Sequence, residues 1–491
     1  MIIKNNPILQ FVIRYLLASL RLSRSGPYAI CLLFAIAYSV LSIVKHDHFL
    51  SGYDLAVSDQ GIWLMSQFKN PISTPHAYAF TSLFSDHVEI IYGLLSPIYW
   101  IANDVRILIA LQAFAISFSA LPIFFIAKMK KLKPILSYSI LTSFLLFYGI
   151  QNAIWADVHS LVFAASFLPW FIYFIEKKNT KWMTIFFILL LSCKEDIALL
   201  TFLLAGIYYL KTKWRPLIYI MGGSVGYILL IFYIYFPHFT KDGYRFQNEN
   251  GLLSNIDLRN FYDTAAKRDV IIYSLAWFGF LPLLAPLFVI PVLADIGHYF
   301  VLGSDYVTSA QSIFLHYRVT LATLLALGTI YSIVKFKKLN HWITGAYILL
   351  FALGMQYILH LPLSYFAKSW FWTKPIGAIN IEKILPELPG TAAVASQNNI
   401  TPHINHRENI FTLWPEKKNF SNDSPCGNPT CDWLRWPGNP EFIIVDTSTE
   451  WDTRHWLTNH DEFINALSNL EKEKRISLFK QIDTAKIYKV L

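Results

Sequence analysis

Long apolar runs dominate the chain and limit what it can fold into. Runs of roughly 17–25 apolar residues, long enough to cross a bilayer as helices, recur from residue 27 to residue 361. Of the 491 residues, 55% are apolar and 15% are charged, whereas soluble globular proteins carry about 25% charged residues. With a mean hydropathy of +0.41, the chain cannot bury its apolar side chains in one aqueous core. The sequence therefore predicts a polytopic α-helical membrane protein and excludes a cytosolic enzyme or a disordered protein.

The positive charge of the chain also fits a membrane protein. A formal net charge of +9 would suit a nucleic-acid binder, but the basic residues form short clusters between apolar runs, as in cytoplasmic loops. We therefore expect the lipid bilayer and no nucleic acid as a partner. The expected location is a bacterial inner (plasma) membrane with the N-terminus in the cytoplasm. The clusters lie at 128–133, 177–181, 211–215 and 335–338.

Apolar length and charge together predict about eleven spans. A cytoplasmic amphipathic segment, 1–26, precedes the first span at 27–44. The run 88–102 is short and contains a proline, so we expect an interfacial or re-entrant helix there. The run 182–210 is interrupted by charges at 193–196, and 270–303 contains three prolines, so each is expected to pass twice. The remaining expected spans are 105–127, 134–150, 160–175, 215–236, 318–334 and 341–360.

The chain then divides into a transmembrane body and a polar C-terminal region. The body covers 27–361 and includes a large first outer loop, 45–104. An odd number of spans places 362–491 outside the cytoplasm. This region contains strand-like runs and one amphipathic helix near 460–474, which predicts a small extracytoplasmic α/β domain. Cys426 and Cys431 flank a turn in it and are expected to form a disulfide, with a free pair as the alternative. The strand-like runs are 391–396, 409–413, 442–446 and 485–491.

Ionisable residues gather in the loops that this topology places on the outer face. Asp54 and Asp59 lie in the first of these loops, in apolar and aromatic surroundings. Ionisable groups at membrane level are costly and indicate function more often than chance, although wet loops also carry ordinary charges. The sequence therefore predicts a polar cavity on the outer face. Its other candidate residues are Asp86, His87, Asp157, His159, Lys194, Glu195, Asp196, His316 and Arg318.

Carboxylates and cations in one cavity suit sugar transfer from a lipid phosphate. Paired carboxylates act as general acids and bases or hold a divalent cation, here Mg²⁺ or Mn²⁺, and Lys194 or Arg318 would neutralise a phosphate leaving group. Because nucleotide sugars are absent outside the cell, the expected donor is a polyprenyl-phosphate sugar and the acceptor an envelope glycan, lipid or protein. We expect Asp59 to be the base, since Trp63 lies on the same helical face and offers a stacking surface. Asp54 is the second candidate and otherwise caps the helix.

Five sequence runs resemble the bacterial membrane-protein family called domain of unknown function 2079, over roughly 45–490. These runs are 52–63, 85–87, 157–159, 193–196 and 396–407. The family is similar to the GT-C class of membrane glycosyltransferases, which includes the protein mannosyltransferases and the aminoarabinose transferase for lipid A.

The resemblance implies a GT-C-like body and assigns roles to several residues. Asp59 occupies the place of the catalytic aspartate, with Gln60 where the class has glutamate, and Lys194 matches a lysine in an outer hairpin. The downstream run, with His403, His406 and Arg407, would cap the cavity or form an ordinary structural turn.

Two other functions remain open at this point. One is a membrane transporter of lipids or solutes, although transporters place polar groups near the bilayer midplane and these acids lie at one face. The other is a non-catalytic envelope protein that binds a polyprenyl lipid.

Overall fold

The computed structural model describes most of the chain. The described residues are 25–75, 81–240, 244, 257–301, 308–336, 339–415, 434–435, 438–448 and 460–491. The predicted amphipathic helix at 8–22 and the predicted disulfide between Cys426 and Cys431 lie outside these residues. Both therefore stay predictions.

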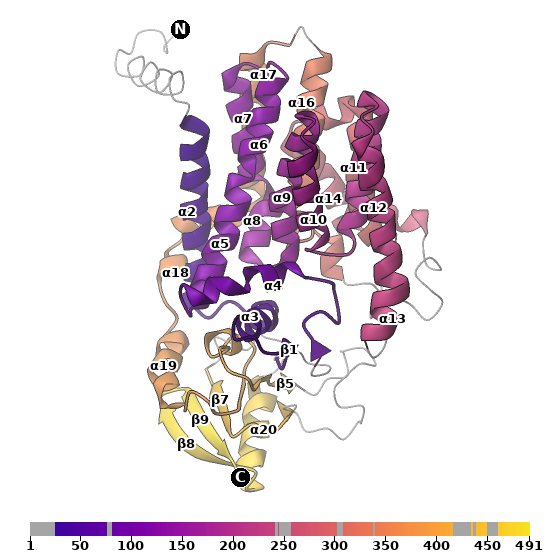
Figure 1. Ribbon diagram of the computed structural model, residues 1–491. Helices are drawn as coiled ribbons and strands as arrows, with labels where there is room; N and C mark the ends of the chain where they lie inside the picture. The colour runs from indigo at the N-terminus through magenta and orange to yellow at the C-terminus, as the bar shows by residue number, and fades with distance from the viewer. Residues whose placement is uncertain are drawn as a thin grey trace, which may run out of the picture.

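A bundle of long helices forms the body of the molecule (Figure 1). Within the described residues, five helical stretches are long and apolar enough to cross a membrane: 26–47, 105–129, 134–155, 216–239 and 341–359. Five shorter apolar helices accompany them there. The bundle contains α2 (Gly26–Asp47), α5 (Val105–Phe118), α6 (Ala120–Met129), α7 (Pro134–Leu146), α8 (Tyr148–Trp155), α9 (Ser160–Glu176), α10 (Thr180–Leu191), α11 (Ile197–Thr212), α12 (Pro216–Leu230), η3 (Ile231–Tyr235), α13 (Phe236–Phe239), α14 (Ala265–Trp277), α15 (Pro286–Phe300), α16 (Leu321–Lys335) and α17 (His341–Leu359).

Helix breaks fall where the sequence places charge or proline. Helix α10 ends at Leu191 and α11 begins at Ile197, so the interruption predicted at 193–196 is confirmed. Between α14 and α15 the chain turns through η5 (Leu281–Leu284). Gly279 precedes that turn at φ +60, and a Cβ there would lie 2.1 Å from the Tyr347 ring, so only glycine fits.

A layer of short elements lies between the bundle and the C-terminal sheet (Figure 1). Helix α3 (Tyr53–Ser66) crosses the end of the bundle, and residues 91–100 of the predicted interfacial run form α4 (Ile91–Leu95) and η2 (Ser96–Trp100). Side chains are buried all around α3, because α4, η2, β1 (Ile72–Ser73) and the C-terminal η9 (Thr401–His403) all pack against it. The smaller elements are β1 (Ile72–Ser73), β2 (Thr81–Ser82), η4 (Leu258–Phe261), η6 (Thr308–Gln311), η7 (Pro362–Ala367) and α18 (Ser369–Trp372).

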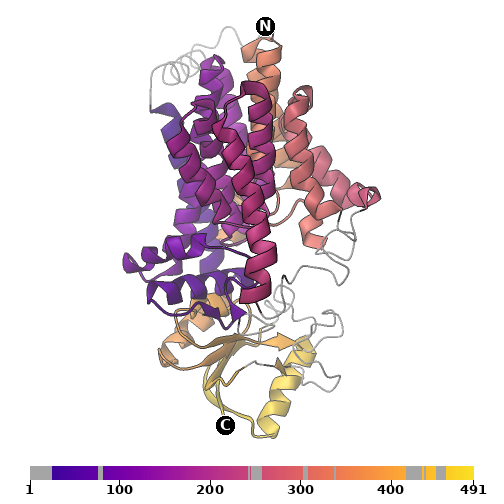
Figure 2. The same ribbon diagram turned by 45° about the vertical axis from the view of Figure 1, so that its right-hand side comes forward.

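A five-stranded sheet occupies one end of the molecule, and the N-terminal ends of α7 and α17 lie at the opposite end (Figures 1 and 2). Its strand order is β4 (Ile410–Thr412), β3 (Val394–Ser396), β7 (Phe442–Asp446), β9 (Ala485–Val490) and β8 (Ile476–Ile482). Strand β3 pairs in parallel with β4 and β7, and β9 pairs antiparallel with β7 and β8. The four predicted strand-like runs are thus strands, and β8 is an additional one.

Alternate side chains of the sheet form two apolar layers, each covered by a helix. Val394 and Ile444 pack with Ile381 of α19 (Ile376–Ile384). Ile443 and Phe411 pack with Phe463 of α20 (His460–Lys472) on the other face. This alternation is the period-2 pattern of a sheet buried on both sides. The remaining elements are η8 (Leu385–Glu387), η9 (Thr401–His403), β5 (Trp414–Pro415) and β6 (Leu434–Arg435).

Candidate functional site

Helix α3 directs its two carboxylates to different sides. Asp54 lies in the first turn and Asp59 five residues later. At 3.6 residues per turn, five residues rotate a side chain by about 140° around the axis. The two groups therefore meet different surroundings.

Asp59 is fully buried and joins three segments of the chain. Its carboxylate accepts hydrogen bonds from the Tyr99 hydroxyl of η2 and from Asn405 Nδ2 at 3.2 Å, and it lies 3.2 Å from His406 Nε2. Asn405 also donates to the backbone carbonyl of Ala56 on α3. These contacts hold α3 against η2 and the loop at 402–407.

Gln60 and Trp63 extend this junction. Gln60 Nε2 donates to Thr74 Oγ1 at 2.8 Å and to the Arg407 carbonyl at 3.1 Å, and the Thr74 amide donates to Gln60 Oε1 at 2.8 Å. The Trp63 indole stacks on the His406 ring, with centroids 5.6 Å apart. The stacking surface that the sequence predicted for a sugar is thus covered by an imidazole.

Asp54 lies in a different setting, beside two histidines. Its carboxylate is 50% exposed and lies 3.6 Å from His159 Nε2. The His159 ring stacks on that of His316, with centroids 3.6 Å apart. The surrounding protein raises the pKa of Asp54 by desolvation, while His159 opposes the rise; burial also lowers the pKa of His159. Asp54 is therefore a solvent-accessible carboxylate.

Asp157 fixes the start of the helix that carries Asp54. It forms an ion pair with Lys45 of α2 and accepts a hydrogen bond from the Gly52 amide at 3.2 Å. Gln112 of α5 connects Asp157 to His159: its side chain donates to the Asp157 carbonyl and accepts from the His159 amide, both at 2.9 Å. The backbone of Asp157 adopts a left-handed conformation, with φ +79. Such a conformation in a residue other than glycine is uncommon and needs support from its surroundings.

Three residues of the first outer loop and the α10–α11 break form an acid–base group. His87 Nδ1 lies 2.7 Å from Glu195 Oε1, and the Val88 amide donates to Glu195 Oε2 at 3.2 Å. Glu89 Oε1 accepts a hydrogen bond from Ser160 Oγ at 2.5 Å. Burial raises the pKa of Glu89 to about 7. Asp86 lies in the turn just before His87.

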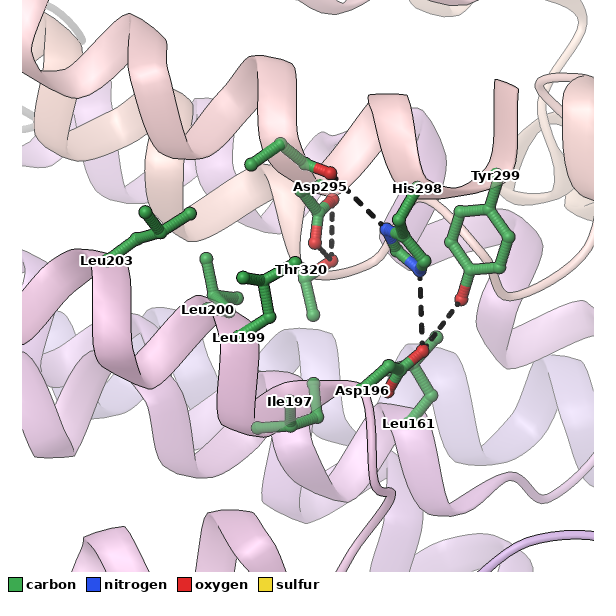
Figure 3. A pocket seen from close by; sticks show the side chains of 11 residues that line it. Leu161, Asp196, Ile197, Leu199, Leu200, Leu203, Asp295, His298, Tyr299 and Thr320 are labelled. Atoms are coloured by element: carbon green, nitrogen blue, oxygen red, sulfur yellow. Dashed lines mark hydrogen bonds and ion pairs between the residues drawn. The ribbon is translucent and has the colours of Figure 1, made fainter. Parts of the chain in front are cut away.

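The second charged group of the break lines a small pocket (Figure 3). Asp196 Oδ2 lies 3.4 Å from both His298 Nε2 and the Tyr299 hydroxyl, and 3.5 Å from Lys194 Nζ. The pocket measures about 20 Å³. Asp295, which accepts a hydrogen bond from Thr320 at 2.9 Å, completes its polar wall. The other labelled lining side chains are apolar: Leu161 lies beside Asp196, and α11 contributes Ile197, Leu199, Leu200 and Leu203.

Arg318 is fully buried and already committed to the backbone. Its guanidinium donates to the carbonyls of Ser312 and Ala310 and lies 5.0 Å from the centre of the Tyr299 ring. Arg318 therefore braces the loop that carries His316.

His403 and Arg407 shape the loop at 402–407. The His403 ring lies between the rings of His46 and Phe49, with centroid distances of 4.1 and 3.5 Å. Burial keeps the pKa of His403 well below its usual value. Arg407 donates to the carbonyls of Ile404 at 2.8 Å and Ala392 at 3.0 Å.

The predicted site residues thus fall into two groups. Asp54, with the histidines and acids of the bundle end, forms one, and Asp59 with the 402–407 loop forms the other. Asp196 lines the pocket of Figure 3, whereas Asp59 lines a separate groove. The single cavity that we expected to contain both does not form, because the turn of α3 separates its two faces. Within the described residues, no group of three or more His, Cys, Asp or Glu side chains is placed to hold a metal ion.

Sequence reasoning gave Glu89 and His298 no specific role. Glu89 is a single acid in a polar turn, and His298 lies near the end of an apolar helix. Their only signal was an ionisable group close to predicted membrane level.

The fold and this polar bundle end define a class, the multi-helix membrane proteins. The family model described as "Predicted membrane protein (DUF2079)" matches residues 45–463. The chain therefore belongs to the DUF2079 family.

A solved structure has the same overall fold. The chain is similar to ArnT from Cupriavidus metallidurans bound to undecaprenyl phosphate, with a TM-score of 0.53, 10% sequence identity, and coverage of 95% of this chain and 98% of that one. ArnT is a GT-C glycosyltransferase, so the likeness shows a GT-C fold. Among curated proteins, no match was found.

Proposed function

We propose that this protein is a membrane glycosyltransferase that moves a sugar from a polyprenyl-phosphate donor to an envelope acceptor. Asp54 is the general base in this proposal. The observation that carries it is the position of Asp54, half-exposed and 3.6 Å from His159, with Asp157 and Lys45 near enough to influence its pKa. The GT-C fold shared with a protein that binds undecaprenyl phosphate supports the donor class.

Charge indicates which membrane face this site occupies. Helices α6, α9, α11 and α16 all run toward one end of the bundle, and their last turns or following residues carry the basic clusters. Figure 1 places α3 and the sheet at the opposite end. Because basic loops stay in the cytoplasm, Asp54 and the C-terminal sheet lie on the periplasmic side in this proposal.

The reaction follows from a carboxylate beside a phosphate-binding cluster. Asp54 takes the proton of the acceptor hydroxyl, whose oxygen forms a bond to the anomeric carbon of the sugar. The bond from that carbon to the phosphate oxygen breaks, and polyprenyl phosphate leaves with the electron pair. The Lys194 ammonium and the His298 ring lie 3.5 and 3.4 Å from Asp196, longer than a close ion pair, so in this proposal both turn from Asp196 to the phosphate. A raised pKa makes Asp54 a stronger base than an ordinary carboxylate.

The pocket in Figure 3 supports a lipid donor. Its leucine wall reaches the outside of the bundle, since Leu199 is 42% exposed on α11. Its volume of about 20 Å³ admits only a water-sized group. The proposal therefore has the isoprenoid chain lie along the outer leucines, with its phosphate at the Asp196 end.

Asp59 has a different role in this proposal from the one expected from sequence. Asp59 has no exposed surface, and its carboxylate oxygens are already occupied by Tyr99, Asn405 and His406. We assign it to positioning: it holds α3, and therefore Asp54, in place.

Purified protein in proteoliposomes tests the function. The probes are polyprenyl phosphates carrying tritiated glucose, mannose, galactose or N-acetylglucosamine, with bacterial envelope extract as acceptor. Wild type should move label out of the polyprenyl pool for one of these donors. Asp54→Asn should lower that rate by about 10²–10⁴-fold and still bind undecaprenyl phosphate in native mass spectrometry.

A matched carboxyl-to-amide control is available outside the cluster. Glu387 forms an exposed ion pair with Lys480 at 3.1 Å, and such pairs contribute little to stability, so Glu387→Gln should transfer at the wild-type rate. Label that stays in the polyprenyl pool with all four donors, or an Asp54→Asn variant as active as wild type, would contradict the proposal.

A further inference from the structure

A cluster of charged and aromatic side chains lies near the bundle end that is opposite the sheet (Figure 1). It forms where the ends of α9, α11 and α16 meet the residue after α6 and the first turn of α15. None of these side chains takes part in the proposed sugar transfer. We call them the Tyr331 cluster: Lys130, Glu176, Tyr208, Lys211, Phe288 and Tyr331.

Tyr331 holds the cluster together. Its hydroxyl donates a hydrogen bond to the Glu176 carboxylate and lies 3.4 Å from the Tyr208 hydroxyl. The Phe288 ring stacks on the Tyr331 ring, with centroids 4.4 Å apart. The other carboxylate oxygen of Glu176 lies 2.7 Å from Lys130 Nζ. The single acid of the cluster is therefore already paired with one of its two lysines.

Lys211 supplies a positive charge that the cluster does not neutralise. Its Nζ lies 3.4 Å from the centre of the Tyr331 ring and 5.1 Å from that of Phe288. Such cation–π contacts orient an ammonium group but leave its charge in place. Within the described residues, the only acid that acts electrostatically on Lys211 is Glu176, which is paired with Lys130. The ammonium is thus held in position and is available to an anion.

Apolar surface continues from Lys211 along the outside of the bundle. Leu210 of α11 is exposed next to Lys211 in the sequence, and α11 packs against α15. Helix α15 exposes a stripe of apolar side chains three or four residues apart, as expected for a face in contact with lipid. The stripe consists of Leu283, Leu287, Ile290 and Leu293. An amphiphile with its head at Lys211 would therefore have apolar surface for its chains.

We propose that the Tyr331 cluster binds an anionic phospholipid, with Lys211 as the cation that contacts the phosphate. The acyl chains lie along the exposed leucines of α11 and α15. In the orientation proposed above this lipid belongs to the cytoplasmic leaflet, where basic pockets between membrane helices bind anionic headgroups. The lipid site is independent of sugar transfer at the opposite end of the bundle.

Three substitutions separate a localised site from the general positive charge of this membrane face. Lys211→Gln removes the charge and keeps a side chain of similar shape, whereas Lys211→Arg keeps the charge. Lys181 is exposed in the first turn of α10, at the same end of the bundle but outside the cluster. Lys181→Gln is therefore the matched control for loss of one positive charge.

Lipid titrations followed by native mass spectrometry of the delipidated full-length protein in detergent test the proposal. The probes are phosphatidylglycerol and phosphatidylcholine with identical acyl chains. Wild type should bind phosphatidylglycerol more tightly. Lys211→Gln should weaken that binding about fivefold, because a lysine near an anionic lipid surface contributes about 1 kcal/mol. Its binding of phosphatidylcholine should be unchanged, and Lys211→Arg and Lys181→Gln should match wild type.

Four results would overturn the proposal. They are equal binding of the two lipids by wild type, wild-type affinity for phosphatidylglycerol in Lys211→Gln, an equal loss in Lys181→Gln, and a fivefold loss in Lys211→Arg. Inorganic phosphate provides a further arm, since it carries the same charged group without acyl chains. It should not displace phosphatidylglycerol, and displacement would show that the cluster binds free phosphate instead.

Discussion

Replacement of each α3 carboxylate by alanine should separate a structural role from a chemical one. Asp59→Ala removes a fully buried carboxylate and strips the Tyr99 hydroxyl, the Asn405 amide and the His406 ring of their shared partner. A buried donor left without its acceptor costs about 1–3 kcal/mol, so loss of the Tyr99 and Asn405 bonds costs about 2–6 kcal/mol together. Asp54→Ala removes a half-exposed carboxylate whose ion-pair partner lies 3.6 Å away, a loss of at most about 1 kcal/mol.

Hydrogen–deuterium exchange detects this difference locally. A cost of about 2–6 kcal/mol corresponds to opening that is about 30-fold to more than 1,000-fold easier. Asp59→Ala should therefore speed exchange in 53–66 and 401–408 together, because both segments lose the same anchor, while α9 and α17 keep wild-type protection. Asp54→Ala should leave all four regions as in wild type. Equal exchange in the two variants, or faster exchange in Asp54→Ala, would refute the division of roles.

Glu89 and Gln60 give two further predictions. The pKa of Glu89 is raised by burial from 4.5 to about 7, so the folded state favours the protonated form. Its contribution to stability falls as pH rises from about 4.5 to about 7 and then levels off. Glu89→Gln should remove this loss, so its melting temperature should fall less than that of wild type between pH 5 and pH 8; parallel curves would contradict the assignment. Gln60→Ala deletes the amide that hydrogen-bonds to Thr74 and the Arg407 carbonyl. It should lower the free energy of unfolding by about 1–3 kcal/mol, which is measured as a lower melting temperature. An unchanged melting temperature would show that these hydrogen bonds do not stabilise the protein.

Much of the fold follows from local pattern. Apolar runs long enough to cross a bilayer become the long helices, and charges at 193–196 end α10 because ionised groups are costly among apolar helices. Strands β3, β4, β7 and β9 were visible as short apolar runs. Strand β8 escaped notice because it is an edge strand with mostly exposed side chains.

The candidate site was predictable in composition but not in arrangement. Side chains are buried all around α3, so its sequence has no single apolar face from which to read the directions of Asp54 and Asp59. What decides between them is the contact of Asp59 with Asn405 and His406, almost 350 positions away in the sequence. Trp63 was expected to stack on a sugar, and its partner proved to be His406 of the same distant loop.

The most direct test of the central claim compares two amide variants of α3 for donor turnover. The measurement is the rate at which label leaves the polyprenyl-phosphate pool in proteoliposomes with equal amounts of folded Asp54→Asn and Asp59→Asn protein. The account predicts that Asp54→Asn loses about 10²–10⁴-fold in rate with wild-type exchange protection, while any loss in Asp59→Asn accompanies faster exchange in 53–66. Full activity in Asp54→Asn, with abolished activity and unchanged protection in Asp59→Asn, would show that Asp59 is the base and contradict the account.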